Sequence, residues 1–98
     1  MTNHAEISRK LAMAIGWKSK QIVVYSGACW IAHPVHQYDI EFDYRDWNVI
    51  GPIAARFDCF PDECADGMWL AFVPHGEFHR ADTPQLAIAL TVIEGVKP

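Results

Sequence analysis

The sequence contains no long hydrophobic run and little cysteine. No apolar stretch approaches the ~20 residues that a membrane-spanning helix needs. Residues 1–6 carry neither a basic leader nor an apolar signal segment. Cys29, Cys59 and Cys64 are an odd number of cysteines, which does not suit a disulfide framework. We therefore expect a cytoplasmic protein with reduced thiols and no membrane partner.

An excess of basic residues and a glycine-rich loop are also missing. The chain has 8 Lys and Arg against 12 Asp and Glu, and its 6 glycines are scattered singly. Aromatic side chains can stack on bases, but such platforms normally line a basic groove. We therefore expect no direct nucleic-acid binding and no phosphate-binding loop. The four tryptophans are instead expected to pack in the core: Trp17, Trp30, Trp47 and Trp69.

No standard metal or catalytic motif is present. Six histidines and cysteines form three spaced pairs: His33 with His36, Cys59 with Cys64, and His75 with His79. None of these pairs has the spacing of a zinc knuckle. Cys59 with His75 or His79 is a loose nucleophile set without a strand-turn-helix elbow around it. We therefore expect no enzyme, no metal and no cofactor, and a metal-dependent enzyme remains the weaker alternative.

The length of 98 residues predicts a single domain spanning residues 1–98, because two smaller cores could not bury enough apolar surface. Near the start, Asn3 and Glu6 have the spacing of a helix N-cap and its reciprocal carboxylate. Gly16 suits a left-handed C-cap. These signals predict a helix over residues 4–15.

Strand signals follow this helix. Two β-rich segments, 21–25 and 28–32, flank Ser26-Gly27 and predict a tight hairpin. From residue 38 to 44 apolar and acidic residues alternate with period two, which predicts a further strand. The alternation places Tyr38, Ile40, Phe42 and Tyr44 on one side and Asp39, Glu41 and Asp43 on the other.

Asp46 can cap a second helix, in which Pro52 requires either a start near Val49 or a kink in the first turn. The inward residues of this helix are expected to be Trp47, Ile50, Ile53, Ala54 and Phe57. Residues 58–67 include Pro61 and four acidic residues, and they are predicted to form an exposed loop.

Two more strands are predicted at 68–73 and 77–81, with a turn at 74–76 between them. Asp82-Thr83-Pro84 starts a last helix that is apolar on nearly all sides, so we expect it to pack in the core. The predicted fold class is α+β. It is a compact single-domain sandwich in which one antiparallel sheet of about four to five strands is covered by about three helices.

Several short segments also carry a family resemblance. They are Asp46-Trp47, Gly51-Pro52-Ile53, Met68-Trp69-Leu70-Ala71, Ala81-Asp82-Thr83-Pro84 and Ala87. In these segments the chain resembles small phage and prophage proteins described as α-β-α sandwich domains, over roughly residues 40–93. The role of that family is unassigned, so the resemblance supplies no site residue. It implies an accessory protein of a phage or mobile element.

Charge is distributed unevenly along the chain. Residues 39–66 hold eight acidic and two basic residues, while the rest of the chain holds four acidic and six basic residues. An acidic patch can attract a basic partner and speed its encounter. The alternative is that these acids occupy a loop and a solvent-facing strand, where charge discourages aggregation of sheets.

The sequence therefore favours a small phage or mobile-element accessory protein in a bacterial host cell. It would bind a basic protein surface of a host factor, as an anti-CRISPR-like antagonist of host defence would. The expected partner-binding residues are Asp39, Glu41, Asp43, Asp58, Asp62, Glu63 and Asp66. The alternative is a phage structural or assembly component that acts by self-association, for example as a homodimer.

Overall fold

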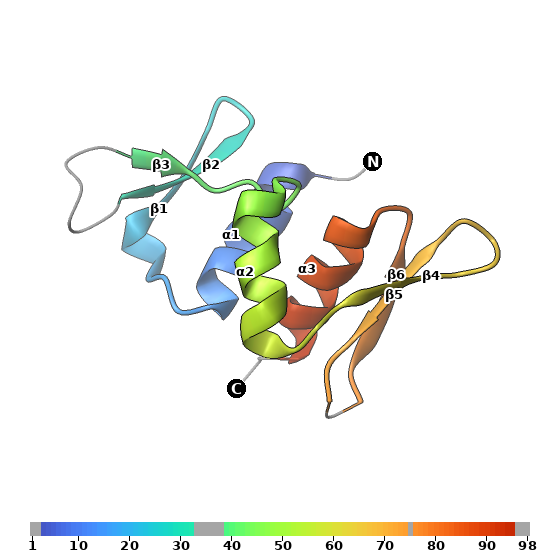
Figure 1. The fold of residues 1–98 in the computed structure, drawn as a ribbon. Helices are drawn as coiled ribbons and strands as arrows, with labels where there is room; N and C mark the ends of the chain where they lie inside the picture. Colours follow the sequence, from blue (N-terminus) through green and yellow to red (C-terminus); the bar gives the residue numbers. More distant parts are fainter. Residues whose placement is uncertain (1–2, 33–38, 75, 96–98) are drawn as a thin grey trace.

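Three helices form the centre of the molecule, and a small sheet lies on either side of them (Figure 1). The computed structural model describes residues 3–32, 39–74 and 76–95. Its radius of gyration is 13.4 Å, close to the ~13 Å expected for one domain of this length. The α+β class and the single compact domain are confirmed.

Helix α1 (His4–Ala14) begins where the sequence predicts, because the Asn3 side chain accepts a hydrogen bond from the Glu6 backbone N–H at 3.1 Å. The Glu6 carboxylate does not complete the reciprocal cap but pairs with Arg9 one turn later. Gly16 has a φ of 114°, as the predicted helix end requires. A short 3-10 helix, η1 (Ser19–Gln21), leads to the first sheet.

The first sheet contains β1 (Ile22–Tyr25), β2 (Ala28–Ala32) and β3 (Asp39–Glu41) in antiparallel order β1-β2-β3. The predicted hairpin is confirmed, with φ of 54° at Ser26 and 77° at Gly27, as a two-residue turn of positive φ requires. Strand β3 is shorter than predicted. Phe42 and Tyr44 are buried beyond its end, and Tyr38 lies outside the described residues.

Helix α2 (Trp47–Phe57) starts directly after Asp46, whose carboxylate accepts a hydrogen bond from the Asn48 N–H at 2.9 Å. A start near Val49 is therefore wrong. The expected inward residues Ile50, Ile53 and Ala54 are buried, and Phe57 packs against the core.

Trp47 is 50% exposed, so its predicted core position is wrong. A helical side chain leans toward the helix N-terminus, and the first residue therefore projects beyond the helix rather than onto a preceding turn. Of the other tryptophans, Trp17 and Trp69 pack against the core as predicted. Trp30 is half-buried and does not belong to the core, so its predicted core position is also wrong.

The second sheet contains β4 (Pro61–Glu63), β5 (Trp69–Phe72) and β6 (Phe78–Ala81) in antiparallel order β4-β5-β6. The prediction of a loop over residues 58–67 is wrong in its middle, where β4 pairs with β5. Pro61 is compatible with a strand here because it is the first residue of an edge strand, where no ladder hydrogen bond has to be donated.

The expectation of one sheet of about four to five strands is also wrong. The described strands form two three-stranded sheets, one before α2 in the chain and one after it. The helices lie between the sheets rather than outside one sheet (Figure 1). Helix α1 packs on β1 and β2, whereas α3 (Pro84–Gly95) packs on β4, β5 and β6.

Helix α3 joins these two halves. It also contacts α1 and α2, and the residues of α3 that are buried lie on several of its sides: Ala87, Ile88, Ala89, Thr91, Val92 and Ile93. The predicted core position of this apolar helix is confirmed. The Thr91 hydroxyl is satisfied by carbonyl oxygens of Ala87 at 2.7 Å and Ala71 at 3.1 Å.

A buried hydrogen bond links α1 to the chain before α2. The Tyr44 backbone N–H donates to the buried Ser8 Oγ at 3.1 Å. Replacing Ser8 by alanine leaves this N–H without its acceptor, so Ser8→Ala should lower the free energy of unfolding by about 1–3 kcal/mol. Urea denaturation measures the change. The exposed Ser19→Ala is the control, expected within about 0.5 kcal/mol of wild type, and equal effects at both serines would contradict this role.

Candidate functional site

The structure divides the seven acidic residues of the predicted binding site into two groups. Asp39 and Glu41 lie on β3, and Asp43 follows it. The other four lie around the second sheet: Asp58 at the end of α2, Asp62 and Glu63 on β4, and Asp66 in the turn after β4. Strands β3 and β4 are at opposite sides of the helices (Figure 1). The seven residues therefore do not form one continuous patch.

Two of these acids have structural partners. The Asp43 carboxylate accepts hydrogen bonds from the Arg45 side chain at 3.0 and 2.9 Å and from the Arg45 backbone N–H at 3.0 Å. The Arg45 guanidinium holds the pKa of Asp43 below its ordinary value. The pKa of Asp66 is lowered by hydrogen bonds from the Met68 backbone N–H and from Arg80. These two carboxylates stabilise turns of the chain itself.

The pairing of Asp43 predicts a pH-dependent contribution to stability. Because its folded pKa lies below its unfolded pKa of ~4, the contribution is fully present above pH ~4 and is lost as the pH falls through the folded value. Asp43→Asn should lower the free energy of unfolding by about 1 kcal/mol at neutral pH, and its difference from wild type should narrow in acid. Urea titrations at several pH values measure this. The exposed Asp39→Asn should change stability by less than about 0.5 kcal/mol at neutral pH, and a difference for Asp43→Asn that persists in acid would contradict the assignment.

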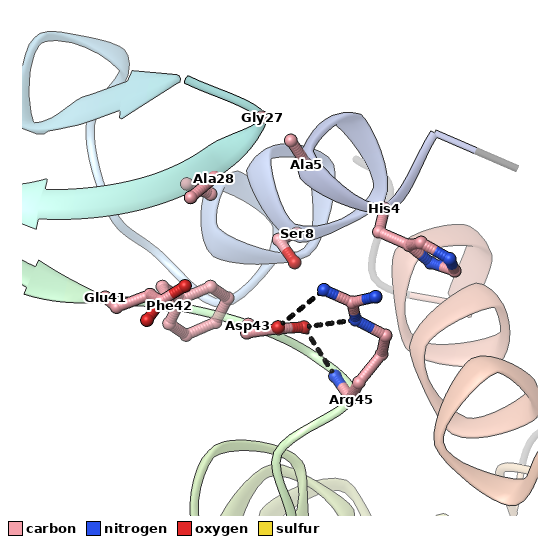
Figure 2. A pocket seen from close by; sticks show the side chains of 10 residues that line it. His4, Ala5, Ser8, Gly27, Ala28, Glu41, Phe42, Asp43 and Arg45 are labelled. Carbon is pink, nitrogen blue, oxygen red and sulfur yellow. Dashed lines mark hydrogen bonds and ion pairs between the residues drawn. The ribbon is translucent and has the colours of Figure 1, made fainter. Parts of the chain in front are cut away.

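Asp43 and Arg45 also border a small hollow between β2, β3 and the start of α1. Figure 2 shows their hydrogen-bonded side chains beside Ser8 and Glu41. The volume of the hollow is about 20 Å³, which is enough for a water molecule but not for a substrate. The hollow is therefore a packing feature of the Asp43 turn.

A larger open cavity of about 530 Å³ lies between His4, Tyr44, Arg45 and the first turn of α3. His4 Nδ1 lies 2.5 Å from the Tyr44 hydroxyl. Burial raises the pKa of Tyr44, so this hydroxyl stays protonated at neutral pH and does not act as a base. The Arg45 guanidinium beside it is held by Asp43. The cavity has the volume of a ligand pocket, but Tyr44 is only 1% exposed, so its hydroxyl is held against His4 rather than presented to solvent.

The residues of the predicted nucleophile and metal pairs do not come together within the described part of the chain. His33, His36 and His75 lie outside it. Among the described residues, no group of three or more His, Cys, Asp or Glu could hold a metal ion. Cys59 is fully buried, and burial raises its pKa to about 11, so its thiol is not a ready nucleophile.

The cysteines predict an order of modification. Cys29 and Cys59 are buried with raised pKa values, whereas Cys64 is half-buried. Because the thiolate is the reactive form and must be reached by solvent, iodoacetamide should modify Cys64 first in the native protein. Peptide mass spectrometry over a time course measures the order. Faster labelling of Cys59 would contradict its burial.

An exposed mixed surface lies on the outer side of the first sheet. Cys29 and Ile31 of β2 are buried toward the helices, so Trp30 between them faces outward. In the register of the sheet Trp30 lies between Val23 and Glu41. We call this surface the Tyr25 face; it comprises Val23, Tyr25, Trp30, Asp39 and Glu41.

The Tyr25 face combines apolar side chains with unpaired carboxylates. Tyr25 is 73% exposed and Val23 is 45% exposed. Asp39 and Glu41 are exposed and have no ion pair or side-chain hydrogen bond with the described part of the chain. Sequence reasoning found the two acids but missed Tyr25 and Val23. The pairing of β1 with β2 could have revealed them, because strand pairing places the outward residues of one strand next to those of the other.

Comparison of the sequence with protein-family models gives no match, and comparison with curated proteins gives none either. The resemblance to small phage proteins thus stays a prediction. Within residues 3–32, 39–74 and 76–95, no helix is long and apolar enough to cross a membrane.

Proposed function

We propose that the chain is a non-enzymatic binding protein that contacts a protein partner through the Tyr25 face. The observation that supports this most is a sheet face turned away from the helices, on which the exposed side chains of Tyr25 and Val23 lie on the same side as two unpaired carboxylates. Aromatic side chains anchor protein interfaces because they bury a large area with few rotatable bonds, and carboxylates add charge selectivity. The proposed partner surface is basic with an apolar centre.

The chemistry of the Tyr25 face argues against nucleic acid as the partner. Asp39 and Glu41 would repel phosphate, and no lysine or arginine belongs to the face. A basic protein surface suits these carboxylates, which would speed association at low salt. We therefore expect this binding to weaken as the salt concentration rises.

The proposed setting follows from the phage resemblance of the sequence. The chain would act in the cytoplasm of a bacterial host as an accessory protein of a phage or mobile element. It would bind a host factor, and an anti-CRISPR-like antagonist of host defence that covers a basic groove is one form of this function.

The alternative is a phage structural or assembly component that acts by self-association. Its support is a separate surface, the outer side of the second sheet, where Phe72 and Phe78 are both exposed. Light scattering of the purified protein separates the two functions. A stable higher oligomer without a host partner favours the alternative.

A charge-reversal experiment tests the Tyr25 face. Asp39→Lys with Glu41→Lys should weaken capture of the host partner about tenfold or more, because both carboxylates then repel the basic surface. Capture of the partner identified with wild type is measured by quantitative pull-down at two salt concentrations. The fold of each variant is checked by circular dichroism.

The matched control is Asp62→Lys with Glu63→Lys on β4, which makes the same change in net charge on the second sheet. This control should retain capture. Equal loss in both double variants would mean that only total charge matters, and equal capture by both would place the contact elsewhere. Either result would reject the Tyr25 face as the binding site.

A further inference from the structure

Three phenylalanines form a row across the outer side of the second sheet. Phe72 on β5 lies directly opposite Phe78 on β6. Pro61, the first residue of β4, lies opposite Ala71, and the same register continued by one residue brings Phe60 level with Phe72 on the other side. The exposed fractions of Phe60, Phe72 and Phe78 are 55%, 49% and 61%. We call these three residues the phenylalanine row.

The inner side of this sheet packs on α3. Ala71 and Ala81 are buried toward α3, and alternation along the strands turns Phe72 and Arg80 away from it. Half-exposure of three phenylalanines leaves an apolar patch of about 300 Å². The largest apolar patch on a typical monomer is about this size or larger and is often functional.

The next row of the same face carries charge of both signs. Asp62 on β4 and Arg80 on β6 are both opposite Leu70 of β5, one on each edge of the sheet. Asp62 has no ion pair with the described part of the chain. Arg80 pairs with Asp66, but its side chain is 50% exposed, and its guanidinium has further N–H donors for a second carboxylate.

The positions of Asp62 and Arg80 on opposite edges of the sheet determine which partner surface is complementary in charge. A basic partner would meet Arg80, and an acidic partner would meet Asp62. A second copy of the chain, rotated about a twofold axis parallel to the strands, presents Arg80 over Asp62 and Asp62 over Arg80. The same rotation places Phe60 over Phe78 of the second copy and Phe72 over its counterpart. The surface is thus complementary to itself in both rows.

We propose that the phenylalanine row is a homodimer interface, in which two second sheets pack face to face around this twofold axis. The apolar patches of two copies cover less than the ~1,200 Å² of a stable interface, so the dimer should be weak and concentration-dependent. The inference does not rest on the Tyr25 face, which lies on the other sheet. Each proposal can therefore fail alone.

Sedimentation equilibrium of the purified chain tests the interface. The average mass of wild type should rise from monomer toward dimer as the concentration increases from low micromolar to millimolar. Phe72→Asp should remain monomeric at every concentration, because it places two carboxylates together at the twofold axis. Tyr25→Asp changes an aromatic on the first sheet that is even more exposed than Phe72; it is the control and should dimerise like wild type. A monomeric wild type, or a dimer that survives Phe72→Asp, would overturn the proposal.

A mixing experiment tests the orientation of the two copies. Asp62→Arg alone places like charges together across the axis, and so does Arg80→Asp alone, so each should be monomeric. In an equimolar mixture, each introduced charge faces an opposite charge of the other variant, and the mass should rise again. Circular dichroism confirms that both variants are folded. A mixture that stays monomeric while wild type dimerises would overturn the twofold arrangement.

Discussion

The burial of α3 from several sides is the constraint on which the rest of the structure depends. Its apolar residues contact the second sheet, α1 and α2, and the alanines Ala87 and Ala89 allow close approach. Five of the 18 buried residues of the hydrophobic core in the described part of the chain belong to α3. Helix α1 covers one side of the first sheet, and α3 covers one side of the second sheet. The other side of each sheet packs on no helix of the described chain.

The one-sided cover of the sheets explains where apolar side chains remain exposed. In an antiparallel sheet that packs on one side only, the outer residues are normally polar. Here Tyr25 and Val23 on the first sheet and the phenylalanine row on the second sheet depart from that pattern. Both exceptions lie where the chain has no further element to cover them within its described part. Exposure of this kind carries a cost in solubility, which is why we propose both surfaces as binding sites.

The acidic residues separate into two classes once their contacts are considered. Asp43 and Asp66 accept backbone hydrogen bonds within turns and pair with arginines, so their charge is used inside the fold. Asp39, Glu41 and Asp62 have no such partners among the described residues. The net acidity of residues 39–66 is therefore not a single binding feature. Part of it is structural, and the remainder is divided between two surfaces with different neighbours.

Local signals in the sequence determined much of the secondary structure. Asn3 and Asp46 cap helices, Ser26-Gly27 forms the hairpin turn, and the apolar residues after Pro84 form the core helix. These features were predictable because each depends on the local backbone geometry or on the composition of its own segment. Strand β4 was not predictable in this way, since Pro61-Asp62-Glu63 has loop composition and is a strand only because β5 lies beside it.

Tertiary structure alone decided how these elements share the core and which surfaces remain. The placement of α2 between β3 and β4 splits the expected sheet into two, and this separates the acids that appear close in sequence. The alignment of Phe72 with Phe78 was decided by the pairing of β5 with β6. Such features depend on contacts between residues far apart in the chain, which neither composition nor periodicity records.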